Sequence, residues 1–487
     1  MQDGCERMAL GTCSTAEGFQ TQAAGRYSHA EGSNTIANGA ASHAEGFKTN
    51  ANGPASHAEG SSNNAYGSAA HCEGYLTQTL ADMAHAEGFS TSAQGPASHA
   101  EGQSTVATGR AAHAEGSSST ASGQASHAEG SLTTASGIAA HAEGEFTTAS
   151  GLVSHAEGQG TIAEGESSHS EGDTTRARGR ASHAEGNLTL ASGSFSHAEG
   201  QRTIAFGDLS HAQGNQSQAI GQNSHAEGAL TIANGFNSHA EGVNTVASGS
   251  FSHTEGQSTN ANTFEGVHVM GQFGAANELS YSWYLANGTD ASTPGLAAKI
   301  LSNGNVKIDG TVSSPAADYA EMFEIADGEP IGHGYFIALS GDKARIATSA
   351  DDYIVGITSA RPAFLSDSGE MRWKNKFLTD EWGDILYEQV TLPEVADGYG
   401  GRVLPEREMV RPRLNPDYRP SDEYVPRLER KEWIAVGMLG KLLVRDNGEC
   451  QPDQYCAPND SGIAVPAANG YRVLKRTGPN QVLVLFR

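Results

Sequence analysis

The sequence has few aromatic residues, few basic residues and no long apolar run. Aromatic residues make up 7% of the 487 positions, whereas 60 positions are glycine, which is unusual for a globular core. The net charge of -26 excludes a general affinity for nucleic-acid backbones or anionic membranes, because both need clustered Lys and Arg. No apolar stretch reaches the roughly 20 residues of a membrane-spanning helix. We therefore expect no nucleic-acid partner and no membrane insertion.

Cysteine is also scarce, and its spacing excludes several classes of site. The five cysteines show no CxxC pairing of the zinc type, and their odd number does not fit a disulfide framework. Cys450 and Cys456 are close enough in sequence to form a bridge, but two free thiols in a reducing compartment are the simpler interpretation. The first residues lack the basic and then apolar run of a secretory signal. We expect synthesis in a cytoplasm, no cofactor and no resident metal.

One motif, SHAEG, recurs through the first half of the chain. Seventeen of the 19 histidines follow one another every 14 residues from His29 to His253, and Thr15 takes the same place in an earlier, degenerate copy. Counted from His, small residues occupy positions -1, +1, +3, +8 and +10, with Glu at +2 and Thr at +6. Only Thr15 and Gln213 break the His and Glu pair. The regularity indicates a repeat architecture without insertions.

The parity of the small residues predicts how each copy folds. Alternate residues of a strand face opposite sides, so Ser, Ala, Thr and Gly point inward while His and Glu point outward. Two short strands per copy then form a parallel β-solenoid whose copies stack about 4.8 Å apart. An interior of Ser, Thr and Ala buries too little apolar area for a single-chain core at about 25 cal/mol per Å². The missing burial is expected on the outward His and Glu face.

The repeat resembles the head repeats of trimeric bacterial adhesins of the YadA type. Those repeats form a left-handed parallel β-roll of 14 residues per turn, with a SVAIG-like motif whose two apolar residues meet near a threefold axis. In this chain His and Glu stand at those two places. The resemblance implies a homotrimeric shaft over residues 1–262, held by intersubunit ladders that include His43, Glu45, His127, Glu129, His183 and Glu185.

Several interpretations of the His and Glu rows remain open. Each imidazole can hydrogen-bond a carboxylate of its own or a neighbouring chain, which would satisfy buried polar groups and fix register. Metal binding between adjacent copies and a solvated outer face are alternatives, whereas catalysis needs a unique constellation that a repeat does not provide. A buried ladder predicts assembly that is sensitive to pH near the imidazole pKa of about 6.5.

The composition changes after residue 262, and residues 263–314 carry ordinary strand patterns. The stretch AAKILSNGNVKIDGTV alternates apolar and polar residues around Asn303 and Gly304, which predicts a β-hairpin. The preceding VHVMGQFGA and YSWYLANGT also have the composition of strands. We expect an intertwined β-rich connector that ends the shaft.

The segment SSPAADYAEMFEIADGEPI, from Ser313 to Ile331, begins a different kind of sequence. Together with DDYIVGI and WKNKFLTDEWGDI it is similar to the autoproteolytic intramolecular chaperone domain that closes Bacillus-phage tail spikes and pre-neck appendages. The resemblance extends from Gly266 to Arg487. It implies that residues 315–487 form a mostly β chaperone domain, which templates trimer assembly and is then cut from the shaft.

The residues of this segment suit self-cleavage. Asp318, Glu321 and Glu324 place three carboxylates within seven residues, just after Ser313 and Ser314. Two carboxylates in unlike environments can act as general acid and general base, and the resemblance favours Asp318 and Glu321 for these roles. A Ser hydroxyl at the junction can also attack the preceding carbonyl and form an ester that water resolves.

We expect one cut between Val312 and Ala317, made in cis or within the trimer, by an acidic-residue peptidase that does not turn over. The alternative for Asp318 and Glu321 is a purely structural role as caps of a short helix, because acids favour helix N-termini. The bond before Pro315 has no amide hydrogen to donate.

The all-β fold class and the two resemblances together predict a phage or prophage tail fibre or appendage protein. It would attach to a host-surface receptor, expected to be a glycan, contact other virion tail proteins, and reside in the virion tail. The alternative is a bacterial trimeric surface adhesin without cleavage. A polysaccharide-cleaving spike has less support, because the repeats offer no unique cluster of carboxylates.

Overall fold

The computed structural model describes residues 6–369, 376–396, 402–404, 406–421 and 424–487. The chain divides into two compact units, residues 1–311 and 312–487. Nearly every element is a β-strand, and the one helical element in the described ranges is a 3-10 turn, η1 (Arg427–Glu429). Within those ranges no helix has the length and apolarity needed to cross a bilayer. The predicted all-β class is confirmed.

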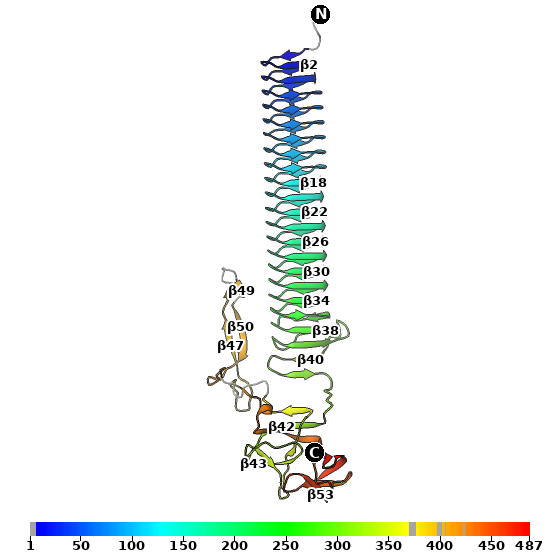
Figure 1. Ribbon diagram of the computed structural model, residues 1–487, viewed down its shortest axis with the longest axis vertical. Helices are drawn as coiled ribbons and strands as arrows, with labels where there is room; N and C mark the ends of the chain where they lie inside the picture. The colour runs from blue at the N-terminus through cyan, green and yellow to red at the C-terminus, as the bar shows by residue number, and fades with distance from the viewer. Residues whose placement is uncertain (1–5, 370–375, 397–401, 405, 422–423) are drawn as a thin grey trace. The chain divides into compact units, whose positions relative to one another are not determined.

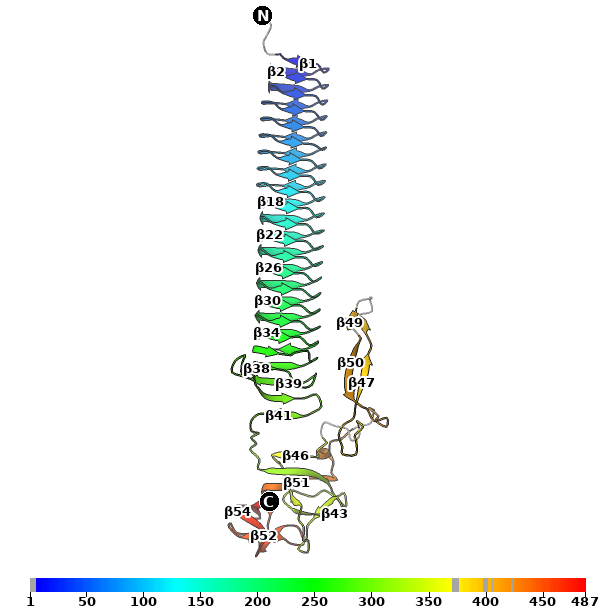
Figure 2. The same cartoon turned by 180° about the vertical axis from the view of Figure 1, so that it is seen from behind.

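The first unit is a parallel β-solenoid in which each repeat contributes two short strands. For example, β18 (His127–Ser131) pairs in parallel with β20 (His141–Glu145), and β19 (Thr134–Ala135) pairs with β21 (Thr148–Ala149). The register joins each residue to the one 14 positions later, so identical side chains lie above one another. Figure 1 shows the stacked strands from β2 (Thr15–Phe19) onward, and Figure 2 shows them from behind.

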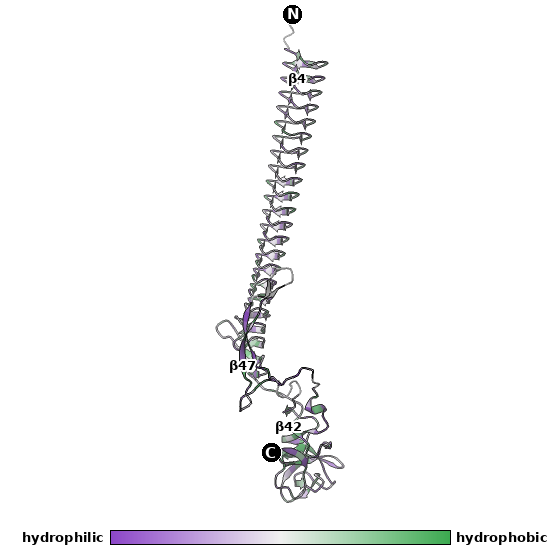
Figure 3. Cartoon of the chain, turned by 90° about the vertical axis from the view of Figure 1, so that its left-hand side faces the viewer, coloured by the Kyte–Doolittle hydropathy of each residue, from purple (hydrophilic) through white to green (hydrophobic). Residues whose placement is uncertain are grey.

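Small side chains fill the interior of the solenoid, as their parity predicts. Ala128 and Ala135 are fully buried, and so is Thr133, while Ser126 is 1% exposed. The Ser126 hydroxyl donates a hydrogen bond to the carbonyl oxygen of Gly123 at 2.8 Å, and similar bonds recur in other copies. The shaft therefore has a thin interior with little apolar area, in agreement with its pale and purple colours in Figure 3.

Glycine at position +3 is required by the close approach of successive turns. Gly158 has φ +101°, and a Cβ built there would lie 2.2 Å from the carbonyl oxygen of Gly172. Two residues later Gly160 has φ +65°, and its nearest neighbour is the Thr174 hydroxyl at 3.6 Å. A side chain at Gly158 would collide with the backbone of the next turn, whereas a side chain at Gly160 would not.

The parallel ladder continues beyond residue 262, where the sequence analysis places the end of the shaft. β36 (His253–Thr254) pairs in parallel with β38 (His268–Ala275), and β38 pairs in parallel with β39 (Trp283–Asn287). The spacing here is 15 residues instead of 14, which hides the continuation from a search for a fixed period. The predicted hairpin follows as β40 (Leu296–Ile300) and β41 (Val306–Ile308), paired antiparallel around Gly304.

The second unit is built on a mostly antiparallel sheet of ten strands. β42 (Asp318–Glu324) opens the unit and pairs antiparallel with the long β51 (Trp433–Arg445) and parallel with β46 (Phe364–Ser366). The other strands of the sheet are β43 (Phe336–Ser340), β44 (Lys343–Ile346), β45 (Gly356–Thr358), β52 (Tyr455–Pro458), β53 (Ala464–Ala467), β54 (Tyr471–Gly478) and β55 (Gln481–Phe486).

The second unit has a core of large apolar side chains, whereas the 14-residue repeats bury mainly Ala, Ser and Thr. Phe336 and Ile357 are fully buried, and they pack with Val444, Val473 and Val484. Green strands near β42 mark this apolar content in Figure 3. Two small ribbons lie outside the main sheet: β47 (Tyr387–Leu392) with β50 (Arg407–Pro412), and β48 (Val395–Ala396) with β49 (Arg402–Leu404).

Candidate functional site

The histidine rings of the repeats form one continuous stack along the shaft. The ring centroids of His127 and His141 lie 4.8 Å apart, and their planes are inclined by 2°. The stack continues past the last regular copy, because His268 lies 4.4 Å from His253. It ends at Trp283, whose ring meets His268 edge-on at 5.1 Å. Parallel in-register pairing imposes this arrangement, since it sets each side chain directly above its copy.

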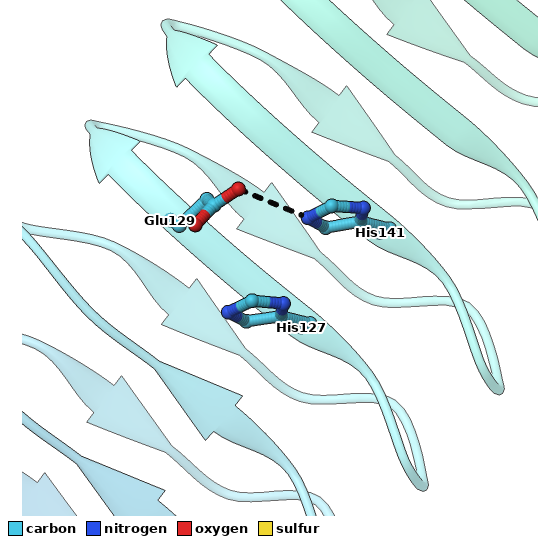
Figure 4. A group of neighbouring side chains, drawn as sticks. All are labelled: His127, Glu129 and His141. Atoms are coloured by element: carbon cyan, nitrogen blue, oxygen red, sulfur yellow. Dashed lines mark ion pairs between the residues drawn. The ribbon is translucent and has the colours of Figure 1, made fainter.

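Most of the imidazoles approach the carboxylate of the preceding repeat. His141 Nε2 lies 3.4 Å from Glu129 Oε1 (Figure 4), and His183 Nε2 lies 3.1 Å from Glu171 Oε1. The other ladder residues singled out in the sequence show the same contact: His43 to Glu31 at 3.6 Å, His57 to Glu45 at 3.9 Å, His127 to Glu115 at 3.4 Å and His197 to Glu185 at 3.3 Å. The pairing therefore forms within one chain.

Part of this hydrogen-bonding capacity is unused in a single chain. The side chains of His141 and Glu129 are 34% and 32% exposed. The Nε2 atoms of His43, His127 and His141 are themselves shielded from solvent, and their carboxylate contacts at 3.4–3.6 Å do not meet hydrogen-bond geometry. A shielded polar nitrogen without a partner is unfavourable, so this geometry supports an interfacial face over a freely solvated one.

The His and Glu rows offer atoms that can bind a metal, but the parallel histidine rings keep these atoms from converging on one ion. One ligand atom each from His127, Glu129 and His141 lie within 4.8 Å of one another, and similar triads recur along the stack. The two imidazole planes are parallel, so their Nε2 lone pairs point in the same direction instead of converging on one ion. A ring would have to rotate out of the stack before both histidines could coordinate one metal at about 2.1 Å.

The close spacing of like groups shifts their pKa values in opposite ways. Burial, followed by repulsion from the rings of His113 and His141, lowers the pKa of His127. Hydrogen bonding between neighbouring carboxylates raises the pKa of Glu115 to about 7 and lowers that of Glu129 to about 2. Some carboxyl groups of the row, such as Glu115, therefore retain protons near neutral pH. Burial also lowers the pKa of His155 and His197 below the ordinary 6.5.

Gln213 is the one exception to the carboxylate row among the copies that carry His. Its side-chain amide donates a hydrogen bond to Glu227 Oε2 at 2.6 Å. It also lies 3.4 Å from His225 Nε2. The amide thus keeps the contacts of the replaced glutamate without its charge.

The predicted cleavage segment lies at the start of the second unit. Ser313, Ser314 and Pro315 are exposed and belong to no strand. The Ser314 hydroxyl accepts a hydrogen bond from the amide of Ala316 at 3.2 Å. Ala317 is also exposed, and the chain enters β42 at the next residue. The segment is accessible, and its position is fixed only at its C-terminal end.

Asp318 is the one predicted catalytic residue that lines a cleft. Its side chain is 7% exposed, and its Oδ2 atom is buried without a hydrogen-bond partner among the described residues. The cleft has a volume of 570 Å³, and basic side chains also line it: His333, Arg361, Lys441, Arg445 and Lys475. The cleft thus places a buried carboxylate and several basic side chains beside Ala316 and Ala317 of the exposed segment.

Glycine in β51 allows the backbone to approach the cleavage segment. A Cβ at Gly440 would lie 2.2 Å from the carbonyl oxygen of Ala317, and Gly440 has φ +119°. The amide of Lys441 donates a hydrogen bond to the same oxygen at 3.3 Å. The amide of Ala363 donates to the carbonyl oxygen of Asp318 at 2.7 Å. Backbone donors therefore hold the carbonyl groups on both sides of the Ala317–Asp318 junction.

The structure does not gather all the predicted acidic residues at one point. Glu321 is half-buried and stands three residues along β42 from Asp318, about 10 Å at the usual strand rise. Glu324 Oε1 accepts a hydrogen bond from Lys343 Nζ at 2.8 Å. The helix-cap alternative for Asp318 and Glu321 is wrong, because both lie in a strand that pairs with β51 over its whole length.

The basic residues of the cleft are functional candidates that the sequence analysis missed. They come from segments far apart in the chain, such as His333, Arg361 and Lys475, so no local motif links them. Only Lys441 could have been noticed in the sequence, because the Gly440–Lys441 pair interrupts the apolar run of β51.

The thiols of the second unit are free, as the sequence analysis expects for Cys450 and Cys456. Cys450 and Cys456 form no disulfide, and burial raises their pKa values to about 11 and about 12. Cys13 and Cys72 are also free, whereas Cys5 lies outside the described residues.

The chain thus combines a β-solenoid of 14-residue repeats with a mostly antiparallel β unit that begins with an exposed segment and the buried Asp318. Residues 286–481 match the family described as Peptidase_G2, IMC autoproteolytic cleavage domain. The repeats match the YadA head domain repeat over residues 86–112, 128–154, 184–210, 198–224 and 226–252. Residues 286–481 are thus similar to an IMC autoproteolytic cleavage domain, and the repeats before them are similar to YadA head repeats.

Similar proteins come from Bacillus phages. The pre-neck appendage protein of Bacillus phage B103 is 31% identical over 191 residues, which are 37% of this chain and 21% of the relative. The pre-neck appendage protein of Bacillus phage phi29 is 35% identical over 145 residues, 29% of this chain and 16% of the relative. The chain thus matches about a fifth or less of these relatives. The crystal structure of the phi29 gene product 12 C-terminal fragment aligns with 35% of this chain and all of that chain, at 29% identity and a TM-score of 0.29.

Proposed function

We propose that this chain is a self-processing shaft protein of a phage or prophage tail appendage. Support comes from the pre-neck appendage relatives and from the order of the two matched domains, with shaft repeats first and a cleavage domain behind them. In this role the shaft attaches to a host-surface receptor, which we take to be a glycan, and contacts other virion tail proteins. The protein is made in the host cytoplasm and resides in the virion tail.

We further propose that three chains associate through the His and Glu face. The interior of the repeats buries mainly Ala, Ser and Thr, and the outward Nε2 atoms of several histidines, such as His43, His127 and His141, are shielded without a hydrogen-bond partner among the described residues. Packing this face against other copies would bury more surface and could provide those partners. The ladder residues His43, Glu45, His127, Glu129, His183 and Glu185 would then lie at the interface.

The observation that carries the cleavage proposal is the buried, unpartnered Asp318 carboxylate directly after an exposed segment. In the proposed reaction a hydroxyl of Ser313 or Ser314 adds to the preceding carbonyl carbon and gives its proton to a carboxylate. The peptide C–N bond breaks, the amine leaves with that proton, and water hydrolyses the resulting ester. Cationic groups such as Lys441 and Arg361 would stabilise the oxyanion that forms on the way.

Asp318 and Glu321 are the proposed acid and base, with Glu324 as a further candidate. Because Glu321 lies farther along the same strand of one chain, its participation requires either a shift of the segment or a carboxylate from a second subunit. The mature shaft would end between Val312 and Ala317, and the released domain would carry the cleft.

The test is expression of the full chain, followed by denaturing electrophoresis and intact-mass analysis. We expect two fragments from the unaltered chain and full-length protein from Asp318→Asn. Asp309→Asn is the matched control, because Asp309 is exposed and lies upstream of the segment. Cleavage of Asp318→Asn at the same rate as the control, or an intact unaltered chain, would overturn the proposal.

The second candidate function is a bacterial trimeric surface adhesin, which the YadA head matches favour when taken alone. It predicts a stable trimer whose chains are never cut, so the same mass measurement separates the two functions.

A further inference from the structure

The outward face of the shaft changes from polar to apolar at its C-terminal end. The ladder positions of His and Glu are taken by His268 and Met270 in β38, and then by Trp283 and Leu285 in β39. In the hairpin that follows, Ile300 pairs with Trp283, and Val306 pairs with Ile300. Paired residues of neighbouring strands share one face of a sheet. The imidazole stack therefore runs directly into an apolar surface on the same side.

This surface, which we call the apolar end patch, consists of Met270, Trp283, Leu285, Ile300, Val306 and Ile308. Trp283 and Val306 are each 58% exposed, and Ile300 is 53% exposed. A cavity of 180 Å³ opens on the patch between β38, β39 and β40. Contiguous exposed apolar area of this kind marks a binding surface on a soluble protein.

The repeats alone leave the register between copies weakly specified, and the apolar end patch can specify it. Every rung from His29 to His253 presents nearly the same imidazole and carboxylate, at one spacing. Two such ladders that slide past one another by one repeat lose only the contacts of a terminal rung, so the repeats specify register weakly. The patch occurs once in the shaft and has a different chemistry from every rung above it.

We propose that the apolar end patch binds the same patch on a second copy of this chain and thereby sets the register of the shaft. This inference rests on the proposed trimer. Copies related by an axis parallel to the shaft bring the same residues to the same height, so Trp283 and Leu285 meet their equivalents while each imidazole meets a carboxylate-bearing rung. A slip of one repeat places Trp283 against His268 and returns apolar area to water.

The position of the patch also gives it a role after cleavage. All six residues precede the predicted cut at 312–317, so they remain with the shaft when the processing domain leaves. Register is then held by the shaft itself, and the processing domain is dispensable once assembly is complete.

The test measures register directly by disulfide cross-linking in full-length chains. The background carries Cys72→Ala, which restores the alanine of most other copies, and Ser at the other four cysteines. One tagged chain carries Glu129→Cys and a second, differently tagged chain carries Glu143→Cys, one rung away. With the patch intact, we expect cross-links almost exclusively between chains that carry Cys at the same position.

The double variant Trp283→Asn, Leu285→Asn should raise cross-links between positions 129 and 143 at least fivefold. The matched control is Phe195→Asn, Leu209→Asn, which removes two exposed apolar residues from other positions of the repeat. Trp283→Phe should retain the register, which separates loss of apolar contact from misfolding. Unchanged register in the double variant overturns the inference while leaving the trimer intact. A monomer from the unaltered chain, measured by sedimentation, refutes the proposed trimer and the inference together.

Discussion

Alanine at Gly158 should destabilise the shaft far more than alanine at Gly160, although the two glycines lie in the same turn. A Cβ at Gly158 would stand 2.2 Å from the carbonyl oxygen of Gly172, so the next turn must move by about 1 Å to restore van der Waals contact. At Gly160 the nearest atom is 3.6 Å away. Other copies already carry larger residues at the second position, such as Phe146 with φ 58° and Thr174 with φ 57°.

The two effects can be given magnitudes. An L-residue at positive φ costs about 1–2 kcal/mol at either site. At Gly158 the displaced turn also weakens about two backbone hydrogen bonds of the β22 (His155–Gln159) and β24 (His169–Asp173) pair, at about 1 kcal/mol each. The smaller entropy of the unfolded chain favours alanine by about 0.4–1 kcal/mol at both sites, so it does not separate the variants. They should therefore differ by about 2 kcal/mol, the contribution of the weakened hydrogen bonds.

Hydrogen exchange of the amides in turns 155–175 is the suitable assay, because a solenoid opens locally and need not unfold as a whole. A difference of about 2 kcal/mol corresponds to about a thirtyfold difference in the local opening constant. Comparable exchange rates in Gly158→Ala and Gly160→Ala would refute the assignment of the +3 glycine to close backbone contact.

Two further predictions concern titrating groups. Hydrogen bonding to neighbouring carboxylates raises the pKa of Glu115 and Glu143 from the ordinary 4.5 to about 7. The protonated carboxyl groups therefore stabilise the folded shaft fully below pH 4.5, and this stabilisation is lost as the pH rises through about 7. The melting temperature of the shaft should fall between pH 6 and 9, and a melting temperature that is constant over this range contradicts the shared protons. The buried thiols of Cys450 and Cys456, with pKa values raised to about 11 and about 12, should react with iodoacetamide at pH 8 only after unfolding, whereas exposed Cys13 reacts at once. Mass spectrometry of the alkylated sites checks this, and equal labelling of all three in the folded chain would disprove it.

The shaft was predictable because one period and one parity recur. His127 and His141 stack, and Ala128 is buried, because the spacing of 14 residues and the alternation of strand side chains leave little choice. The extension through His268 and Trp283 was not predictable by the same means, because the spacing lengthens to 15 and the motif loses its Glu.

The candidate cleavage site was predictable only in part. The sequence motif indicates Asp318 as a chemical group, but its structural alternative, a helix cap, was wrong, because the preference of acids for helix N-termini is only local. Long-range pairing with β51 decides in favour of the strand. The cationic side of the cleft depends on the folded sheet, which brings His333, Arg361 and Lys475 together from segments with no shared motif.

Gln213 interrupts the carboxylate row with a side chain that carries no charge. A side-chain amide keeps its protons over the whole physiological range, so it cannot pass a proton between Glu199 and Glu227 as a carboxyl group would. At residue 213 the row therefore offers no carboxyl group that could take up a proton from a neighbouring rung.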